Sequence, residues 1–160
     1  MPTASRAADL PASLDVIVVG GGPAGTTAAT YLAMRGHSVA LLEREPGPRH
    51  RVGESLLPSM MPILEDFGML EIIEQQGFAR KTGGTFIWGR SQEPWDVLFG
   101  NNPFLPFPYA YHVDREVFDD LMLDNARESG VHVVQGVNVR GPVLDDDRVI
   151  GVRLVDTDGE

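Results

Sequence analysis

Apolar residues recur with two different periods along the chain, which predicts alternating strands and helices. Residues 15–20 are a continuous β-branched run, which suits a central parallel strand buried on both faces, and residues 38–43 are a second short aliphatic run of strand length. Residues 26–35 lie between them and are compatible with a helix, and Gly36 is placed to end that helix in a left-handed conformation. The order strand, helix, strand predicts a βαβ unit, and therefore an α/β fold with a parallel sheet.

Three more helices are predicted further along the chain. Residues 58–67 and 69–76 have apolar residues at helical spacing, and Gly68 separates the two segments. Asp114 is a good N-cap for a longer helix over residues 115–129. Further strands are expected at residues 85–88, 95–99, 131–134, 139–144 and 149–155.

Composition and charge exclude several classes of partner. The chain is 42% hydrophobic and 22% charged, which is ordinary for a globular protein, and its formal net charge is −10. That charge repels phosphate backbones and anionic membrane surfaces, so we expect no nucleic-acid or membrane partner. No apolar run is long enough for a signal peptide or a membrane span, so we expect a cytoplasmic protein.

Metal and thiol chemistry are also disfavoured. The chain has no cysteine, which excludes disulfides, thiolate metal sites and a cysteine nucleophile. Its four histidines show no paired ligand spacing, so no metal site is predicted.

A glycine-rich hexapeptide connects the first strand to the first helix. Its sequence is Gly-Gly-Gly-Pro-Ala-Gly, the G-x-G-x-x-G pattern of dinucleotide-binding folds. Gly20 permits the tight turn, Gly22 leaves room for a pyrophosphate, and Gly25 lets the helix approach the strand. Pro23 and Ala24 lie in the loop just before the predicted helix, at whose start free N–H groups and the helix dipole attract an anion. The structural alternative is a glycine-rich turn without a ligand.

Glu43 closes the second strand, near the expected spacing of about 20 residues after the glycines. A carboxylate at this place accepts hydrogen bonds from ribose hydroxyls and repels a 2′-phosphate, which disfavours NADP. These features do not distinguish FAD from NAD, because both carry the adenosine and pyrophosphate that such a unit binds.

The segment after the second strand carries a family resemblance. Arg44 leads towards the loop Arg51-Val52-Gly53-Glu54-Ser55-Leu56-Leu57-Pro58. With the glycine hexapeptide, this segment resembles FAD monooxygenases of the p-hydroxybenzoate hydroxylase fold, and Gly-Glu-Ser followed by Pro most resembles the flavin-dependent halogenases. The resemblance implies that Arg44, Arg51, Gly53, Glu54 and Ser55 lie near the cofactor. The structural alternative for the loop is a cap and turn before a helix.

A second point of resemblance surrounds Lys81. This lysine stands just ahead of Gly-Gly-Thr-Phe-Ile-Trp-Gly, similar to the segment that carries the active-site lysine of halogenases acting on phenolic or pyrrolic rings. The resemblance implies that reduced FAD, O2 and halide produce hypohalous acid, and that the lysine delivers the halogen to an electron-rich ring. A flexible lysine amine suits this role physically. The structural alternatives are a solvated lysine before an edge strand and, for Arg80 beside it, a surface charge.

A third point of resemblance precedes the long helix. The segment Tyr111-His112-Val113-Asp114-Arg115 is similar to one in flavin monooxygenases where an arginine at the position of Arg115 contacts the cofactor. The alternative for Arg115 is an ion pair on its own helix. His112 has no identifiable partner and is expected to be a satisfied or exposed histidine. Val139 matches the strand in which this fold offers backbone groups to adenine.

Eight of the 12 aromatic residues lie between Phe86 and Tyr111. They either line an aromatic substrate pocket or form the core between a sheet and its covering loops, and the core is the expected arrangement.

The resemblance predicts an FAD-dependent halogenase with a Rossmann-like FAD-binding domain of the p-hydroxybenzoate hydroxylase type. Residues 1–14 are expected to be a disordered leader and residues 15–160 a partial FAD-binding domain. Residues from about 80 to 112 are expected to begin an inserted substrate-binding sheet. The implied partners are FAD, halide, a separate flavin reductase and a small aromatic substrate, either free or tethered to a carrier protein.

Two other classes of function stay open on the sequence. A flavin-dependent hydroxylase or epoxidase, or an isoprenoid-type reductase, shares the fold and needs no special lysine. A non-catalytic module would bind the nucleotide and perform no chemistry.

The length of 160 residues is short for such a flavoprotein. Two later segments of the family, a Gly-Asp segment and a Trp-rich motif, do not occur in the sequence. Asp158-Gly159 is a hairpin turn signal that no return strand follows. We therefore expect the front part of a longer enzyme, and we expect these residues alone to bind FAD poorly and to show no turnover.

Overall fold

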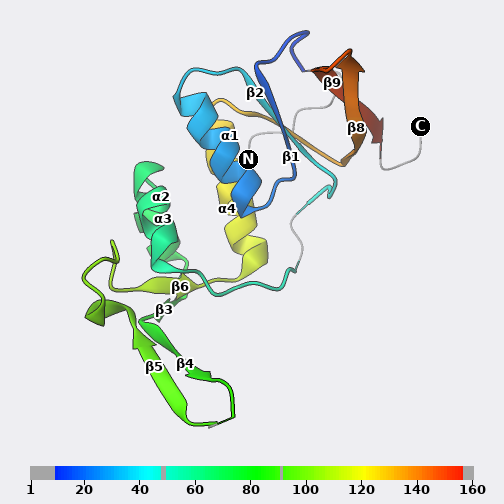
Figure 1. Cartoon of the computed structure of the whole chain (residues 1–160). Helices are drawn as coiled ribbons and strands as arrows, with labels where there is room; N and C mark the ends of the chain where they lie inside the picture. Colours follow the sequence, from blue (N-terminus) through cyan, green and yellow to red (C-terminus); the bar gives the residue numbers. More distant parts are fainter. Residues whose placement is uncertain (1–9, 48–49, 91, 157–160) are drawn as a thin grey trace. The chain divides into compact units, whose positions relative to one another are not determined.

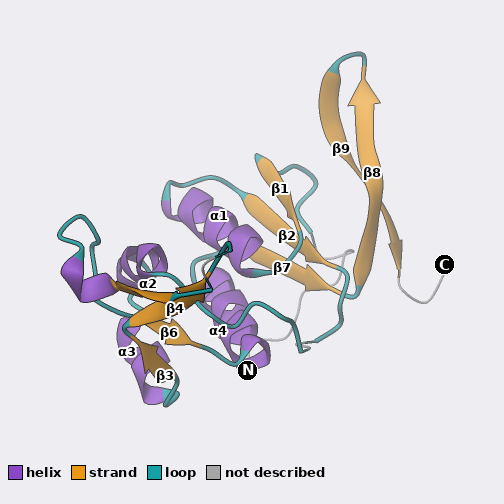
Figure 2. Ribbon diagram, turned by 60° about the horizontal axis from the view of Figure 1, so that its bottom comes forward, coloured by secondary structure: helices purple, strands orange, loops and turns teal. Residues whose placement is uncertain are grey.

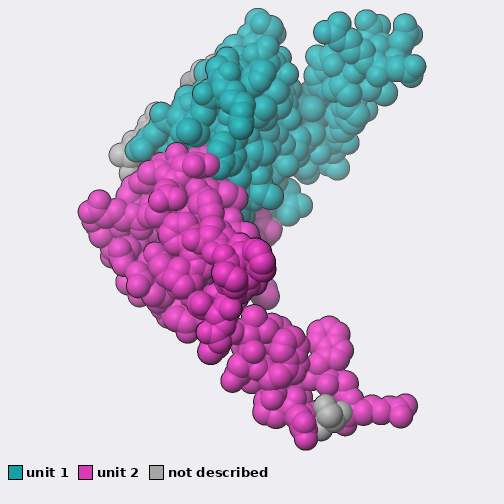
Figure 3. Space-filling view, turned by 60° about the vertical axis from the view of Figure 1, so that its left-hand side comes forward, with its two compact units in different colours: residues 1–49, 119–160 teal, residues 50–118 magenta. Residues whose placement is uncertain are grey.

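The computed structural model describes residues 10–47, 50–90 and 92–156. Its backbone forms two compact units (Figures 1 and 3). Unit 1 takes the described residues of 1–49 and 119–160, and unit 2 takes those of 50–118. Most of the predicted leader and the predicted turn at Asp158-Gly159 lie outside the described residues.

Unit 1 is built on a three-stranded parallel sheet. Strand β2 (Val39–Glu43) lies between β1 (Val16–Val19) and β7 (His132–Gln135) (Figure 2). Helix α1 (Pro23–Met34) connects β1 to β2, so the predicted βαβ unit is confirmed. The helix begins earlier than expected because the proline, with its fixed φ, occupies the first helical turn.

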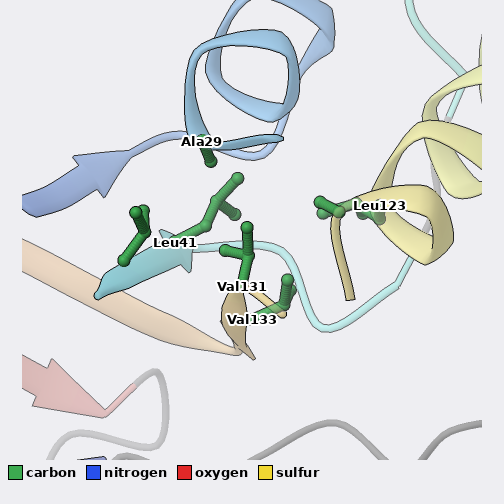
Figure 4. Packing of buried hydrophobic residues seen from close by; sticks show 7 residues of the cluster. Ala29, Leu41, Leu123, Val131 and Val133 are labelled. Atoms are coloured by element: carbon green, nitrogen blue, oxygen red, sulfur yellow. The ribbon is translucent and has the colours of Figure 1, made fainter. Parts of the chain in front are cut away.

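Two helices cover one face of this sheet. Helix α1 and the part of α4 (Arg115–Glu128) that belongs to unit 1 pack against alternate residues of β2 and the region of β7 (Figure 4). The alternation follows the two-residue period of a strand, in which successive side chains point to opposite faces. The buried cluster consists of Ala29, Val39, Leu41, Leu123, Ala126, Val131 and Val133.

An antiparallel hairpin covers the other face. Strands β8 (Val137–Asp145) and β9 (Arg148–Asp156) pair with each other, as predicted. Leu42 and Val134 belong to a second buried cluster, against which Val152 and other hairpin residues pack. The parallel sheet is therefore enclosed between helices and a β-hairpin.

The position of the first strand differs from the prediction. Its run of valines and isoleucine was expected to be buried on both faces, but Val19 is 58% exposed and β2 is the strand with four fully enclosed positions. The reason is the strand order, since within the described residues β1 pairs on one side only. Hydrophobicity predicts a strand, and its neighbours decide how deeply it is buried.

The close approach of α1 to β1 requires glycine at position 25. A β-carbon added to Gly25 would lie 1.9 Å from the carbonyl oxygen of Gly20, where no relaxation short of moving the backbone could accommodate it. Gly20 has a φ of +105°, so the turn itself also needs glycine. The helix can sit this close to the strand only because neither position carries a side chain.

Unit 2 combines short helices with two pairs of antiparallel strands. Its helices are the 3₁₀ turn η2 (Pro58–Met60), α2 (Met61–Asp66), α3 (Leu70–Gln75) and the 3₁₀ turn η3 (Phe99–Asn101). Its strands are β3 (Ala79–Lys81), paired with β6 (Ala110–His112), and β4 (Gly83–Ile87), paired with β5 (Pro94–Leu98).

Strands β3 and β6 were not predicted. Each has three residues, too few to show a period in the sequence, and they form because each supplies the other's backbone partners. The β4–β5 hairpin was expected, with slightly different bounds.

The aromatic residues of unit 2 do not form the single core that was predicted. Phe99 and Tyr111 are buried, but Phe86 is 42%, Trp95 51% and Trp88 77% exposed. Phe86 and Trp95 stack on each other across the hairpin, with ring centroids 5.0 Å apart. The expectation fails because β4 and β5 form a two-stranded sheet whose aromatic face no described element of this unit encloses.

We predict that Gly25→Ala destabilises unit 1 by at least about 3 kcal/mol, because the added methyl group overlaps a backbone oxygen. Urea unfolding followed by circular dichroism measures the change. The control is Gly151→Ala on β9, where an added β-carbon has no neighbour within 4 Å. Equal stability of the two variants would contradict the proposed close approach.

Candidate functional site

The glycine loop of unit 1 has the form of an anion cradle. Gly22 is the N-cap of α1, and no side chain among the described residues caps it. A β-carbon added to Gly22 would meet nothing within 4 Å, so the space in front of the helix start is open. The first-turn N–H groups therefore face a space that a pyrophosphate can enter, and the residues present fit this part of a dinucleotide.

The side chain of Thr26 forms hydrogen bonds within the first turn of α1. Its side chain is fully buried, and its hydroxyl donates to the carbonyl oxygens of Gly22 at 3.0 Å and Pro23 at 3.2 Å. The hydroxyl thus stabilises the loop carbonyls and leaves the helix N–H groups unobstructed.

Glu43 connects the end of β2 to the glycine loop. Its Oε2 accepts a hydrogen bond from the backbone N–H of Gly21 at 2.5 Å, and its Oε1 accepts one from Glu45 at 2.9 Å. Each carboxylate oxygen keeps a further lone pair, so the group can still accept from a ribose hydroxyl.

Gly21 has a structural role that the motif alone does not predict. A β-carbon at Gly21 would lie 3.0 Å from the β-carbon of Glu43, so a larger residue would press on the carboxylate that binds the loop. The sequence indicates this role only in one way: position 21 is glycine although the motif accepts any residue there.

Arg44 and Val139 were also predicted to contact the cofactor, and neither takes part in the hydrogen bonds of the glycine loop given above. Arg44 is exposed and forms an ion pair with Glu45 at 3.2 Å. Val139 lies in β8 and packs against the second hydrophobic cluster. Their roles toward a cofactor stay predictions.

In unit 2, the predicted flavin-side loop is held as an extra strand on β6. The N–H of Val113 donates to the carbonyl of Glu54 at 2.8 Å, and the N–H of Leu56 donates to the carbonyl of Tyr111 at 3.0 Å. Ser55 forms an antiparallel bridge with His112 between these two bonds. The loop before the helix is therefore an extended segment that pairs with β6 at one isolated bridge.

The side chains of Glu54 and His112 form a pair beside this bridge. His112 Nε2 lies 3.2 Å from Glu54 Oε2, and both side chains are about half exposed. The sequence offered no partner for His112, and the expected satisfied histidine is what the structure contains.

Arg115 holds the preceding turn. Its Nη1 donates to the carbonyl oxygens of Val52 and Gly53, each at 3.3 Å. Gly53 has a φ of +109°, and a β-carbon there would lie 3.1 Å from Arg115 Nη1. Arg115 thus shapes the loop that was predicted to contact the cofactor, and Arg51 begins that loop in a half-buried position.

Lys81 is the predicted catalytic residue, and its amine is held in place. Its Nζ donates to Ser55 Oγ at 2.7 Å and to the Leu56 carbonyl at 3.3 Å. The Phe99 ring lies on a further side, with its centroid 5.2 Å from Nζ. The side chain is half-buried, and these contacts restrain its amine.

The side chain of Arg80 lies on the face of β3 opposite to that of Lys81. Its guanidinium stacks over Tyr109, 4.1 Å from the ring centroid, and pairs with Glu74 at 2.8 Å. Successive strand residues point to opposite faces, so this cluster anchors β3 while Lys81 faces the loop.

A cavity of about 310 Å³ opens beside Lys81. Thr85 and Asp96 lie on its wall and are joined by a hydrogen bond of 2.6 Å from the threonine hydroxyl to the carboxylate. The complete lining consists of Lys81, Thr82, Gly83, Gly84, Thr85, Asp96 and Leu98. A space of this size, with one amine and one carboxylate, suits a small polar guest.

The composition of the chain also distinguishes Lys81. Lys81 is the single lysine of the chain, and every other side-chain cation is an arginine. A lysine supplies a compact amine with three hydrogen-bond donors, which the planar guanidinium of arginine does not.

Comparison with known proteins shows the family to which the chain belongs. A family model described as tryptophan halogenase matches residues 15–105 and 101–160. The chain belongs to the tryptophan halogenase family. The predicted resemblance to flavin-dependent halogenases is thereby confirmed, as is the Rossmann-like fold class.

Individual relatives of the chain are halogenases as well. The chain is 43% identical over 144 residues to a tryptophan 2-halogenase of Chondromyces crocatus, covering 90% of this chain and 27% of the relative. It is 35% identical over 141 residues to a 1H-pyrrole-2-carbonyl-[peptidyl-carrier protein] chlorinase of Pseudomonas fluorescens, covering 78% and 31%. The chain therefore spans about a quarter to a third of these relatives.

A solved structure is similar over almost the whole chain. It is a myxobacterial chondrochloren halogenase described as FAD-dependent, 44% identical, with a TM-score of 0.85. The match covers 94% of this chain and 35% of that one.

Two kinds of feature are missing from the described part of the chain. It contains no cluster of three or more His, Asp or Glu side chains that could hold a metal ion. None of its helices has the length and apolar character needed to cross a bilayer.

The pKa of Tyr109 gives a pH-dependent prediction. Burial raises this pKa above its ordinary value of 10.0, neighbouring Tyr111 raises it further, and Arg80 opposes the rise. The neutral phenol is therefore favoured in the folded chain, and its stabilising effect is present below pH 10.0 and lost as the pH rises through the folded pKa.

We expect Tyr109→Phe to lose less stability than the wild type between about pH 9 and about pH 11, because phenylalanine does not ionise. Urea unfolding at the two pH values measures this. Gly151→Ala in β9 is the control, because it keeps all three tyrosines, and it should follow the wild type. A Tyr109→Phe variant that loses as much stability as the wild type would show that Tyr109 does not titrate abnormally.

Proposed function

We propose that this chain is the FAD-binding and lysine-bearing segment of a flavin-dependent halogenase that acts on an electron-rich aromatic substrate. Family membership and the restrained amine of Lys81 beside a cavity support this proposal. The observation that carries it is the amine, because a hydroxylase of the same fold has no need to hold a single lysine between a hydroxyl and a carbonyl.

The residues of unit 1 would hold FAD. The N–H groups at the start of α1 would bind the pyrophosphate, and Glu43 would accept hydrogen bonds from the ribose. Reduced FAD, when bound, reacts with O2 and supplies the oxidising power that converts halide into hypohalous acid. Such an enzyme needs a flavin reductase to deliver the reduced cofactor, and we propose a separate one as a partner.

The residues of unit 2 would transfer the halogen. Two N–H groups of Lys81 are used by Ser55 and by the Leu56 carbonyl, which leaves one position on the nitrogen for hypohalous acid. The amine would hold the acid while the electron-rich ring attacks its halogen. The ring carbon gains the halogen, the oxygen leaves with the hydrogen it carried and takes up the displaced ring proton, and water is released.

The substrate is proposed at the level of class. The Chondromyces relative is a tryptophan halogenase and the Pseudomonas relative is a chlorinase of a carrier-bound pyrrole, so both are halogenases of electron-rich rings. A free or carrier-tethered aromatic ring therefore fits the proposal.

We predict that Lys81→Ala in the complete halogenase abolishes halogenation, a loss of at least about 100-fold in kcat, because the group that receives and directs the acid is gone. FAD binding should be unchanged, since no described contact of Lys81 involves the glycine loop. Product is measured by liquid chromatography and mass spectrometry with chloride present. Undiminished halogenation would reject the lysine assignment, and hydroxylated product formed without halide would favour a hydroxylase.

We predict that Gly22→Val in the complete enzyme weakens FAD binding at least about 10-fold, because the side chain fills the space intended for the pyrophosphate. Flavin fluorescence measures the affinity. Gly151→Val is the control, since its added β-carbon also meets nothing within 4 Å but lies on β9. Wild-type affinity in the Gly22 variant would exclude this loop as the pyrophosphate site.

A further inference from the structure

The side chain of Lys81 reaches its partners by passing over another strand. Lys81 on β3 is directly opposite Ala110 on β6, and the loop residues 54–56 lie along the other edge of β6. Opposite residues of an antiparallel pair share a face, so the lysine runs over a single methyl group. Ala110 is fully buried, and its small size leaves the path to Ser55 clear.

The two hydrogen-bond acceptors at the end of this path differ in kind. One acceptor is the backbone carbonyl of Leu56, which lies 3.3 Å from Nζ. The N–H of Leu56 donates to the carbonyl of Tyr111, and this hydrogen bond fixes the backbone there. The Ser55 hydroxyl is nearer, at 2.7 Å, and within the described residues it is the only side-chain oxygen that accepts a hydrogen bond from the amine. A hydrogen bond to a charged donor at this length is a strong one.

Backbone bonds on both sides hold Ser55 in place. Glu54 accepts from Val113, Leu56 donates to Tyr111, and Ser55 itself bridges His112. A serine whose backbone is fixed this way presents its hydroxyl near a defined point, whereas the long side chain of lysine has many rotamers.

We propose that Ser55 is a positioning residue for Lys81, in place of the direct cofactor contact that the sequence suggested. The Ser55 hydroxyl directs one N–H of the Lys81 amine toward the loop. It thereby determines the direction in which the third N–H, the one that Ser55 and Leu56 do not use, points. This inference rests on the proposed function, because it concerns the delivery step assigned to Lys81.

The first test measures the restraint on the amine without FAD or activity. Lys81 is the only lysine, so acetylation by an N-hydroxysuccinimide ester at fixed pH labels two amines, Lys81 and the N-terminus. Mass spectrometry of peptides gives the ratio of the two rates. In Ser55→Ala and the near-isosteric Ser55→Cys, we expect Lys81 to label about 3- to 10-fold faster than in the wild type, the change that corresponds to losing a typical hydrogen bond.

Two variants separate positioning from a general loosening of the fold. Ser55→Thr keeps the hydroxyl and should restore the slow rate. Ser59→Ala removes an exposed hydroxyl from the neighbouring η2 turn and should leave the ratio unchanged. An unchanged ratio in both Ser55→Ala and Ser55→Cys overturns the proposal, and so does an increase in Ser55→Thr as large as in Ser55→Ala.

The second test uses the complete halogenase. Ser55→Ala should lower kcat for halogenation several-fold and leave both the substrate KM and FAD affinity unchanged, and Ser55→Thr should recover kcat. A Ser55→Ala variant with reduced FAD affinity and unaltered labelling of Lys81 would restore the cofactor-contact interpretation and overturn ours. If Lys81→Ala itself leaves halogenation intact, the proposed function fails, whereas the labelling ratio still decides whether Ser55 holds the amine.

Discussion

The backbone of β6 is the constraint on which the candidate halogenation site depends. Its three residues pair with β3 on one edge and with residues 54–56 on the other, so two segments far apart in sequence meet across one strand. Lys81 comes from the first segment and Ser55 from the second. Each contact is modest by itself, but the register of the strands determines which side chains can meet at all.

The glycine loop depends on a different constraint, which is the absence of side chains. Gly25 allows α1 to approach the strand, and Gly22 leaves open space before the helix start. Glu43 then ties the loop to the end of β2 through the N–H of Gly21. One unit thus offers a preformed anion cradle, and the other holds a restrained amine.

The parts predicted well from the sequence are those with local causes. The βαβ order, the helix capped near Asp114 and the hairpin of β8 and β9 follow from periodicity, capping and turn residues. The exposure of Trp88 and Trp95 was predicted wrongly, because burial depends on what packs against a strand and not on the strand's own composition. Strands β3 and β6 were missed for a related reason, since three residues carry no readable period.

The sequence by itself determined the fold class and the dinucleotide motif, because glycines at fixed spacing between a strand and a helix are visible without coordinates. The role of Lys81 was predicted from the family resemblance of its flanking residues. Only the tertiary structure decided the partners of the functional groups. It placed Ser55 against the lysine, His112 against Glu54 and Arg115 against the carbonyls of the loop. Those contacts arise from strand pairing between distant segments, and the hydrogen-bonding groups that specify such pairing are the same at almost every residue.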